Sequence, residues 1–164
     1  MRRFALAALV ASLAAPAFAQ NVPTQGTFGV GASLFADPTT GAASLGSGLN
    51  LSYLALDQLK LEGDFGVVSV SGAASVITVG ASALYYVVKK PSQQFAIPVA
   101  GGLGLNFISP NVGNSTTQFF MSLGGGAEYY LSRHFSLQLL EGFQFNTQPD
   151  TFALITKVGL EWYF

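Results

Sequence analysis

Large apolar residues alternate with small or polar residues along most of the chain after residue 24. A repeat of two residues places successive side chains on opposite faces of a β-strand, so the pattern predicts an all-β protein. The segments between the alternating stretches are rich in Gly, Pro, Asn, Asp and Ser, which favour turns. The predicted strands cover residues 25–36, 44–56, 59–70, 75–88, 94–107, 117–131, 135–146 and 151–164.

The two faces of the predicted strands differ in kind. One face carries large aliphatic and aromatic side chains, and the other carries glycine, small residues and polar residues. A water-soluble sandwich also buries its large residues on one face, so alternation alone does not separate a soluble from a membrane protein.

The placement of aromatic residues favours a membrane protein. If the strands run up and down from a periplasmic N-terminus, six aromatic residues fall near the periplasmic ends: Tyr53, Tyr85, Tyr129, Phe135, Trp162 and Phe164. Five fall near the outer ends: Phe35, Phe107, Phe119, Phe145 and Phe152. Aromatic rings at both rims are typical of a membrane β-barrel, where they lie at the boundary between lipid and water.

The first 19 residues have the features of a secretory signal peptide. Two arginines precede an apolar stretch, and Ala17 and Ala19 form an A-x-A cleavage site. This pattern predicts cleavage before Gln20 and a single mature domain over residues 20–164. A retained N-terminal anchor helix is the alternative, although the apolar stretch is short for a membrane span.

The composition narrows the class further. Charged residues make up only 9% of the sequence and aromatic residues 13%, which is unfavourable for a water-soluble domain. No segment of the mature chain offers the ~20 apolar residues of a transmembrane helix, so a closed β-barrel is the remaining way to cross a bilayer. Without the two arginines near the N-terminus, five Lys and Arg stand against eight Asp and Glu, a net charge of −3. With no basic patch, nucleic acid is not expected as a partner.

Six charged residues fall within predicted strands on the small-residue face: Lys60, Glu62, Asp64, Glu128, Lys157 and Glu161. Charges are costly on a lipid-facing surface, whereas inside a barrel they can pair across strands. The interior of an eight-stranded barrel is just wide enough to be filled by side chains. The sequence therefore predicts an eight-stranded antiparallel up-and-down transmembrane β-barrel whose lumen is plugged by ion pairs. A conducting or catalytic role for these residues is the alternative.

Glu141 does not fit this division between the faces. It shares its face with large apolar neighbours such as Leu139 and Phe143, so simple alternation points it at lipid. A β-bulge near Gly142 would turn it inward, and the sequence leaves both orientations open.

The single histidine, His134, stands in a predicted turn with no nucleophile and carboxylate arranged around it in the sequence. We interpret it as a turn residue and expect no catalytic site, cofactor or metal.

The last eight residues, KVGLEWYF, carry Lys157, Gly159, Trp162 and a final aromatic, Phe164. This segment resembles the β-signal by which the barrel-assembly machinery recognises outer-membrane barrels. The resemblance implies that these four residues guide assembly.

Two further segments, GGGAEYYLSRHFSLQLLEGFQF (124–145) and PVAGGLGLNF (98–107), are similar to the OmpA-like/OmpX-like outer-membrane β-barrel superfamily. The resemblance implies a place in the bacterial outer membrane, with outer-membrane lipid, periplasmic chaperones and the assembly machinery as partners. It also implies that Glu128 belongs to an internal salt-bridge network. The peptidoglycan-binding domain of full-length OmpA-type proteins is not expected in this chain.

Three functional classes follow from this interpretation. The first is a barrel with a structural role in the envelope and at most a narrow passage for small solutes. The second is a surface barrel that binds or adheres through its outer loops, and the third is a lipid-modifying barrel enzyme. The outer loop predicted at 109–116 is short and uncharged, and no suitable His, Ser and carboxylate gather near the outer rim. The sequence thus favours the structural class and predicts no enzyme, and it leaves the oligomeric state open.

Overall fold

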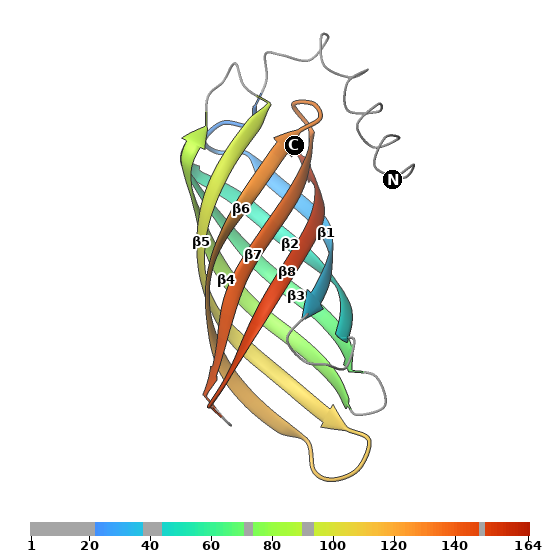
Figure 1. Ribbon diagram of the computed structural model, residues 1–164. Helices are drawn as coiled ribbons and strands as arrows, with labels where there is room; N and C mark the ends of the chain where they lie inside the picture. The colour runs from blue at the N-terminus through green and yellow to red at the C-terminus, as the bar shows by residue number, and fades with distance from the viewer. Residues whose placement is uncertain (1–21, 38–43, 71–73, 90–93, 148–149) are drawn as a thin grey trace, which may run out of the picture.

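The computed structural model describes residues 22–37, 44–70, 74–89, 94–147 and 150–164, so the predicted signal peptide with its cleavage site lies outside the described residues. The described residues form eight strands (Figure 1). Among them, no helix is long and apolar enough to cross a membrane. The strands are β1 (Phe28–Asp37), β2 (Ser44–Leu56), β3 (Leu59–Val70), β4 (Ala74–Lys89), β5 (Phe95–Pro110), β6 (Thr116–Tyr130), β7 (Phe135–Thr147) and β8 (Asp150–Tyr163).

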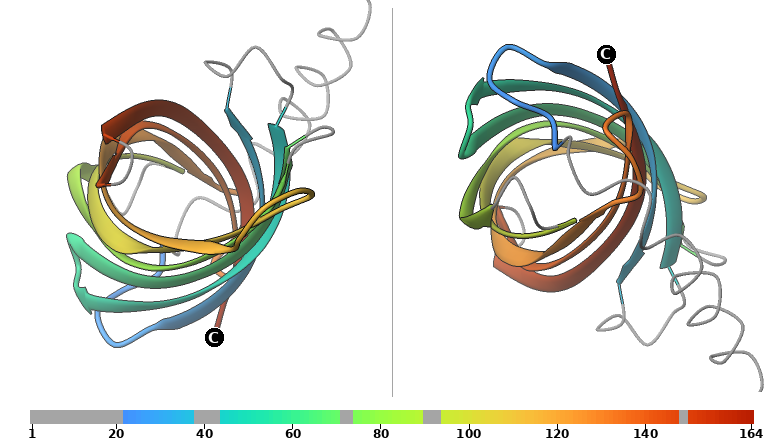
Figure 2. Two further views of the ribbon diagram at one scale, coloured as in Figure 1. Left: turned by 90° about the horizontal axis from the view of Figure 1, so that it is seen from below. Right: turned by 90° about the horizontal axis from the view of Figure 1, so that it is seen from above.

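Each strand pairs antiparallel with its neighbours in the sequence, and β8 pairs with β1 to close the sheet. Viewed from either end, the tilted strands form a closed ring (Figure 2). Because every strand has a partner on both sides, the backbone hydrogen-bonding groups are satisfied within the sheet, as a lipid environment requires. The predicted fold class, an eight-stranded antiparallel up-and-down barrel, is confirmed.

All but two strand ends lie within one residue of their predicted positions. The first exception is the start of β1, which begins at Phe28 rather than at residue 25 because the chain turns just before it. Gly26 has a φ of +88°, a conformation that glycine adopts readily, and the Thr27 N–H donates to the carbonyl of Thr24 at 3.2 Å. The second exception is β5, which continues to Pro110 because Ile108 still pairs with strands on both sides.

The two ends of the barrel are distinct. Phe164 lies at one end, together with the turn at residues 57–58 and the turn at 131–134; we call this the terminal end (Figure 1). The opposite end carries the loop at 111–115, and we call it the loop end.

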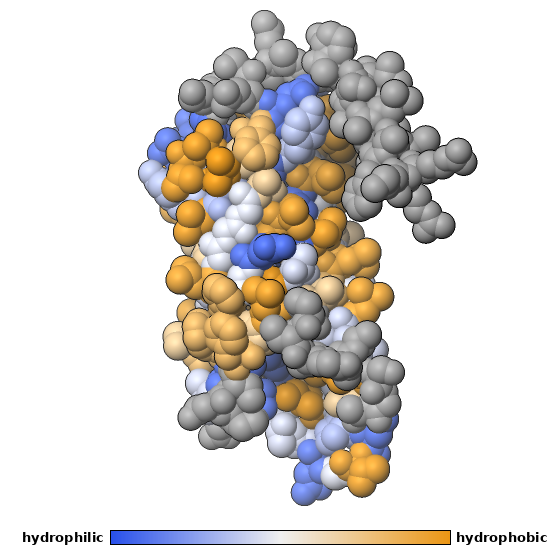
Figure 3. Space-filling model, viewed as in Figure 1, coloured by the Kyte–Doolittle hydropathy of each residue, from blue (hydrophilic) through white to orange (hydrophobic). Residues whose placement is uncertain are grey.

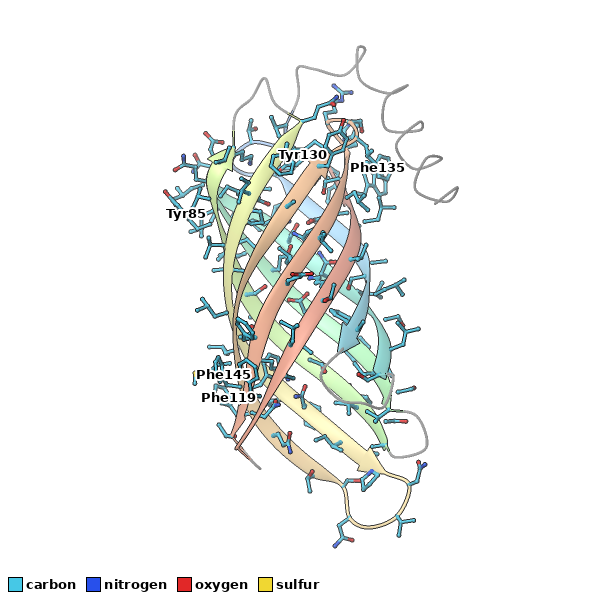
Figure 4. The ribbon with its side chains drawn as sticks, viewed as in Figure 1. Tyr85, Phe119, Tyr130, Phe135 and Phe145 are labelled. Carbon is cyan, nitrogen blue, oxygen red and sulfur yellow. The ribbon has the colours of Figure 1, made fainter. Side chains whose placement is uncertain are left out.

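The outer surface of the barrel is apolar. Large hydrophobic side chains from all eight strands are exposed there, while the alternate positions point inward. Figure 3 shows hydrophobic residues over much of one side, with hydrophilic residues at both ends and a small hydrophilic patch at mid-height. Tyr85 and Phe135 lie near the terminal end, and Phe119 and Phe145 lie near the loop end (Figure 4). Two aromatic rims therefore bound an apolar belt, which is the arrangement that suits a bilayer.

Phe35 does not belong to the outer aromatic rim that the sequence predicts. The sequence pattern predicts Phe35 in the outer aromatic ring, but its neighbour Leu34 takes the outward position and Phe35 points into the lumen. Its ring occupies space left by glycine, because a Cβ atom built at Gly48 would lie 2.7 Å from Phe35 Cε2. The two glycines beside it, Gly48 and Gly66, thus make room for an inward aromatic ring.

A small hydrophobic core fills the lumen at the terminal end. Its members are almost fully buried and come from five different strands: Leu54, Tyr86, Ala96, Tyr130 and Tyr163. Val22, which precedes β1, packs against this core. The interior is therefore filled by side chains at this end, as expected for a barrel of this size.

Candidate functional site: the charged lumen

The structure places all six charged residues of the predicted network on the inner wall. Lys60, Glu62 and Asp64 lie at alternate positions of β3, Glu128 lies on β6, and Lys157 and Glu161 lie on β8. The alternation that points apolar neighbours at lipid also points these side chains inward. Three strands that are far apart in the sequence thereby bring their charges to one place.

Lys60 is the hub of this cluster, and its side chain is 0% exposed. Its Nζ lies 3.0 Å from Glu62 Oε1, 3.4 Å from Glu128 Oε2 and 2.7 Å from Glu161 Oε2. It also donates to the hydroxyl of Tyr163 at 3.2 Å. One buried ammonium group therefore neutralises parts of three carboxylates, and a lysine suits this task because its three donors rotate freely.

Two tyrosine hydroxyls complete the surroundings of Glu128. Tyr86 donates to Glu128 Oε2 at 2.5 Å, and Tyr163 donates to Glu128 Oε1 at 2.6 Å. The Tyr163 hydroxyl also lies 3.0 Å from Glu161, which in turn accepts a hydrogen bond from Ser52. Because buried charges are costly without partners, these hydroxyls are a necessary part of the cluster.

Lys157 forms the second centre, one layer nearer the loop end. Its Nζ lies 3.2 Å from Glu62 Oε2 and 2.9 Å from Asp64 Oδ1. Glu62 thus bridges the two lysines, with one oxygen on each. Asp64 is the most exposed member, with 22% of its side chain exposed, and its other oxygen accepts from Ser82 at 3.3 Å.

Further polar groups lie in the lumen, and the sequence pattern does not place one of them, Lys89, there. Lys89, assigned to a turn, is the last residue of β4, and its buried Nζ lies over the Tyr86 ring, 5.0 Å from the ring centroid. Near the loop end, a chain of hydrogen bonds runs from Thr78 to Asn106 (2.9 Å) and from Asn106 to Asn146 (3.2 Å). Among the described residues, three lysines and four carboxylates therefore place their charged groups in the lumen, a balance of −1.

Tyr86, Tyr130 and Tyr163 could have been found from the sequence. Each follows another aromatic residue directly, in the pairs Tyr85-Tyr86, Tyr129-Tyr130 and Trp162-Tyr163. In a strand, adjacent side chains point to opposite faces, so one member of each pair must face the lumen. The outward members form part of the predicted rim, and the inward members are the tyrosines of the core.

Glu141 faces outward. The pairing of β7 with both neighbours is regular around Gly142, without the bulge that would have turned the carboxylate inward. Glu141 is the seventh of the 13 residues of β7, and its side chain is exposed between Leu139 and Phe143. A carboxylate thus stands at mid-height on the surface that is otherwise suited to lipid.

Replacing Glu141 by Leu should stabilise the barrel in a bilayer by about 1–2 kcal/mol, because it removes a charge from the lipid-facing surface. Urea unfolding in phospholipid vesicles measures the change. The reverse substitution two residues away, Leu139→Glu, should destabilise by a similar amount. A Glu141→Leu protein that is less stable than the parent would show that the carboxylate has a favourable partner in the membrane.

His134 and Arg133 lie in the turn before β7. His134 Nδ1 lies 2.9 Å from the carbonyl oxygen of Tyr163, and the Arg133 Nε–H donates to His134 Nε2 at 2.8 Å. Both ring nitrogens are thus engaged in local contacts of the turn. In the part of the chain that the structure describes, no group of three His, Cys, Asp or Glu residues could hold a metal ion.

Comparison with known proteins supports the fold. No profile of a known protein family matches the sequence, and no curated protein matches it. Among solved structures, the N-terminal β-barrel domain of Pseudomonas aeruginosa OprF is similar, with 15% identity and a TM-score of 0.74 over 87% of this chain and 100% of that one. Neisserial surface protein A (NspA) has 14% identity and a TM-score of 0.67 over 84% and 96% of the two chains. Ail, the attachment invasion locus protein of Yersinia pestis, has 13% identity and a TM-score of 0.53 over 85% and 99%.

At these levels of identity, the similarity concerns the fold and not the activity. The three structures are outer-membrane barrels with the same number of strands as this chain. The resemblance inferred from the sequence is therefore confirmed for the architecture: this chain has the fold of the small eight-stranded β-barrels of the bacterial outer membrane.

Proposed function

We propose that the protein is a structural barrel of the bacterial outer membrane whose lumen is closed to bulk water and ions. The observation that carries this proposal is the complete burial of Lys60 and its partners, Glu62 and Glu128, across the lumen. The hydrophobic core at the terminal end adds a second closed layer next to them. A path for ions would have to break several buried ion pairs and displace packed tyrosines, which makes opening costly.

The location is part of the same proposal. An apolar belt between two aromatic rims fits a bilayer, and the signal peptide predicted over residues 1–19 would direct the chain across the inner membrane. Lipid, periplasmic chaperones and the barrel-assembly machinery are the partners that this route requires. The described loop at 111–115 is only five residues long and so offers little surface for adhesion.

Conductance tests the proposal. Protein refolded into a planar lipid bilayer should conduct far less than a porin of 16 or more strands, whose lumen is open to water. Both proteins are measured in the same salt and the same bilayer. In a separate experiment, N-terminal sequencing of protein from outer-membrane fractions tests whether the mature chain starts at Gln20. Large, long-lived openings from the pure protein would contradict a closed lumen.

A further inference from the structure

The lumen is not filled uniformly. On the loop-end side of the ion cluster it contains a cavity of about 190 Å³. Glycines from four strands form much of its wall, and the rings of Phe35 and Phe120 also line it. The carboxylates of Glu62 and Asp64 and the ammonium group of Lys157 lie on the side facing the ion cluster. The wall glycines are Gly66, Gly80, Gly124, Gly125 and Gly142.

Glycine and phenylalanine together create this space. A Cβ atom at Gly104 would lie 2.6 Å from Phe120 Cζ, and one at Gly80 would lie 3.3 Å from the same atom. Phe120 therefore packs closely against the glycine wall of β4 and β5, as Phe35 packs against Gly48. Because the two rings lie against the wall, they leave the space between them unfilled. The sides of the cavity are thus mainly apolar and partly aromatic, and the uncharged polar residues among them are Thr78, Ser82, Ser122 and Gln144.

The charged side of the cavity is negative. Asp64, with 22% of its side chain exposed, is the most accessible carboxylate of the cluster, whereas Glu62 and Glu128 are fully buried. Among the residues that the structure describes, Lys157 is the only cation that lines the cavity, and it faces two carboxylates. The second oxygen of Asp64 has one long hydrogen bond, from Ser82 at 3.3 Å. It can accept a further and stronger contact.

We propose that this cavity binds a small organic cation, an ammonium group on a compact apolar body. The volume is comparable to the engineered apolar cavity of about 150 Å³ that binds benzene, so a ligand of that size fits. Aromatic rings attract cations, and quaternary ammonium groups are recognised in this way in other proteins. Asp64 supplies the opposite charge, and the low-dielectric surroundings strengthen the attraction. An anion would meet the excess negative charge, and the described residues include no group of three His, Cys, Asp or Glu that could hold a metal ion.

Two probes of nearly equal shape test the proposal: tetramethylammonium and uncharged tert-butanol. Each is titrated into the protein refolded in detergent micelles, and binding is followed by NMR shifts of the cavity residues. Tetramethylammonium should saturate, with shifts centred on Phe35, Phe120 and Asp64, and tert-butanol should bind at least about tenfold more weakly because it lacks the charge. Equal affinity of the two probes, or no saturable binding of the cation, would overturn the proposal. This comparison needs no variant and so does not depend on a variant's folding.

A pair of variants locates the charge. Asp64→Asn should weaken tetramethylammonium binding at least about tenfold, because it removes the accessible carboxylate. Asp57→Asn makes the same chemical change at an exposed residue in the turn at the terminal end, which does not line the cavity, and should leave binding unchanged. Heat-dependent gel mobility confirms that both variants are folded. Unchanged binding by a folded Asp64→Asn protein, or an equal loss in both variants, would show that the cation does not bind where we place it.

Discussion

Replacing Lys60 by Met should lower the free energy of unfolding by about 3–5 kcal/mol, the range for removing one partner of a buried ion pair. Lys60 is completely buried and contacts Glu62, Glu128 and Glu161. Methionine has a similar length and fills the space, so the loss is mainly electrostatic. Three carboxylates would remain close together, and only Glu62 would keep a second lysine, Lys157.

Urea unfolding in phospholipid vesicles measures this change, and the fluorescence of the single tryptophan, Trp162, reports it. Lys89→Met is the matched control: the same substitution at the same end of the barrel, at a lysine whose Nζ has no hydrogen-bond partner among the described residues. The control should change stability much less than Lys60→Met. Equal stability of the Lys60→Met protein and the parent would mean that the cluster holds its carboxylates without this cation, and the view of Lys60 as its hub would be wrong.

Replacing Phe164 by Ala should remove most of the assembled protein from cells while leaving refolding into detergent close to normal. We propose that the assembly machinery recognises Phe164 together with Lys157, Gly159 and Trp162. In the folded barrel, the Phe164 side chain is 68% exposed and contributes only about 1–2 kcal/mol of burial. Its main-chain N–H, which donates to Phe28 at 2.9 Å, is kept by the substitution. A loss seen only in cells therefore has to arise before folding is complete.

Phe28→Ala provides the comparison, because Phe28 is an exposed aromatic residue at the same end of the barrel and its ring lies 4.7 Å from that of Tyr53. Immunoblotting of outer-membrane fractions measures assembly in cells, and gel mobility measures refolding in vitro. We expect the two variants to refold alike and only Phe164→Ala to assemble poorly. If Phe164→Ala failed equally in both assays, the residue would act through stability and not through recognition.

The sequence contains most of the information that defines the strands. In a barrel, one face of every strand meets lipid and the other meets a narrow lumen, so the repeat of two residues is strong and long. Turns rich in Gly, Pro and Asp then limit most strand ends to within one residue, with the start of β1 and the end of β5 as exceptions. The orientation of Glu141, in contrast, does not follow from the sequence pattern. Whether a strand contains a bulge depends on its pairing with both neighbours, which a pattern along one strand does not record.

The sequence pattern also does not decide which of two adjacent large residues points inward. Alternation requires that one member of Leu34-Phe35 and one member of Phe119-Phe120 point inward, but it does not say that the lumen has room for a ring. That room comes from glycines on neighbouring strands, such as Gly48 beside Phe35 and Gly104 beside Phe120. The cavity between these rings depends on the register of several strands together.

The charged cluster in the lumen is likewise predicted only in part by the sequence. The parity of Lys60, Glu62 and Asp64 along one strand is visible in the sequence, and so is that of Lys157 and Glu161. The ion-pair partners are not visible in the sequence. They depend on which residues of β6 and β8 lie at the same height in the barrel as a given residue of β3. Lys60 meets Glu128 and Glu161 across the lumen only because the tilt of the strands brings these positions to one height.

The closure of β8 against β1 has a consequence for the rate of folding. Lys60 and Glu161 are 101 residues apart in the sequence, and no single hairpin contains both of their strands. Contacts of such large sequence separation form slowly, since a long loop must close before they contribute. We expect the carboxylates on β3 and β6 to stay hydrated until then. Closure of the sheet and desolvation of the charged groups therefore occur in one step. A partly opened barrel would expose the same charges to lipid, and the barrier to unfolding is correspondingly high. The persistence of the folded barrel in the membrane is therefore expected to be kinetic as much as thermodynamic.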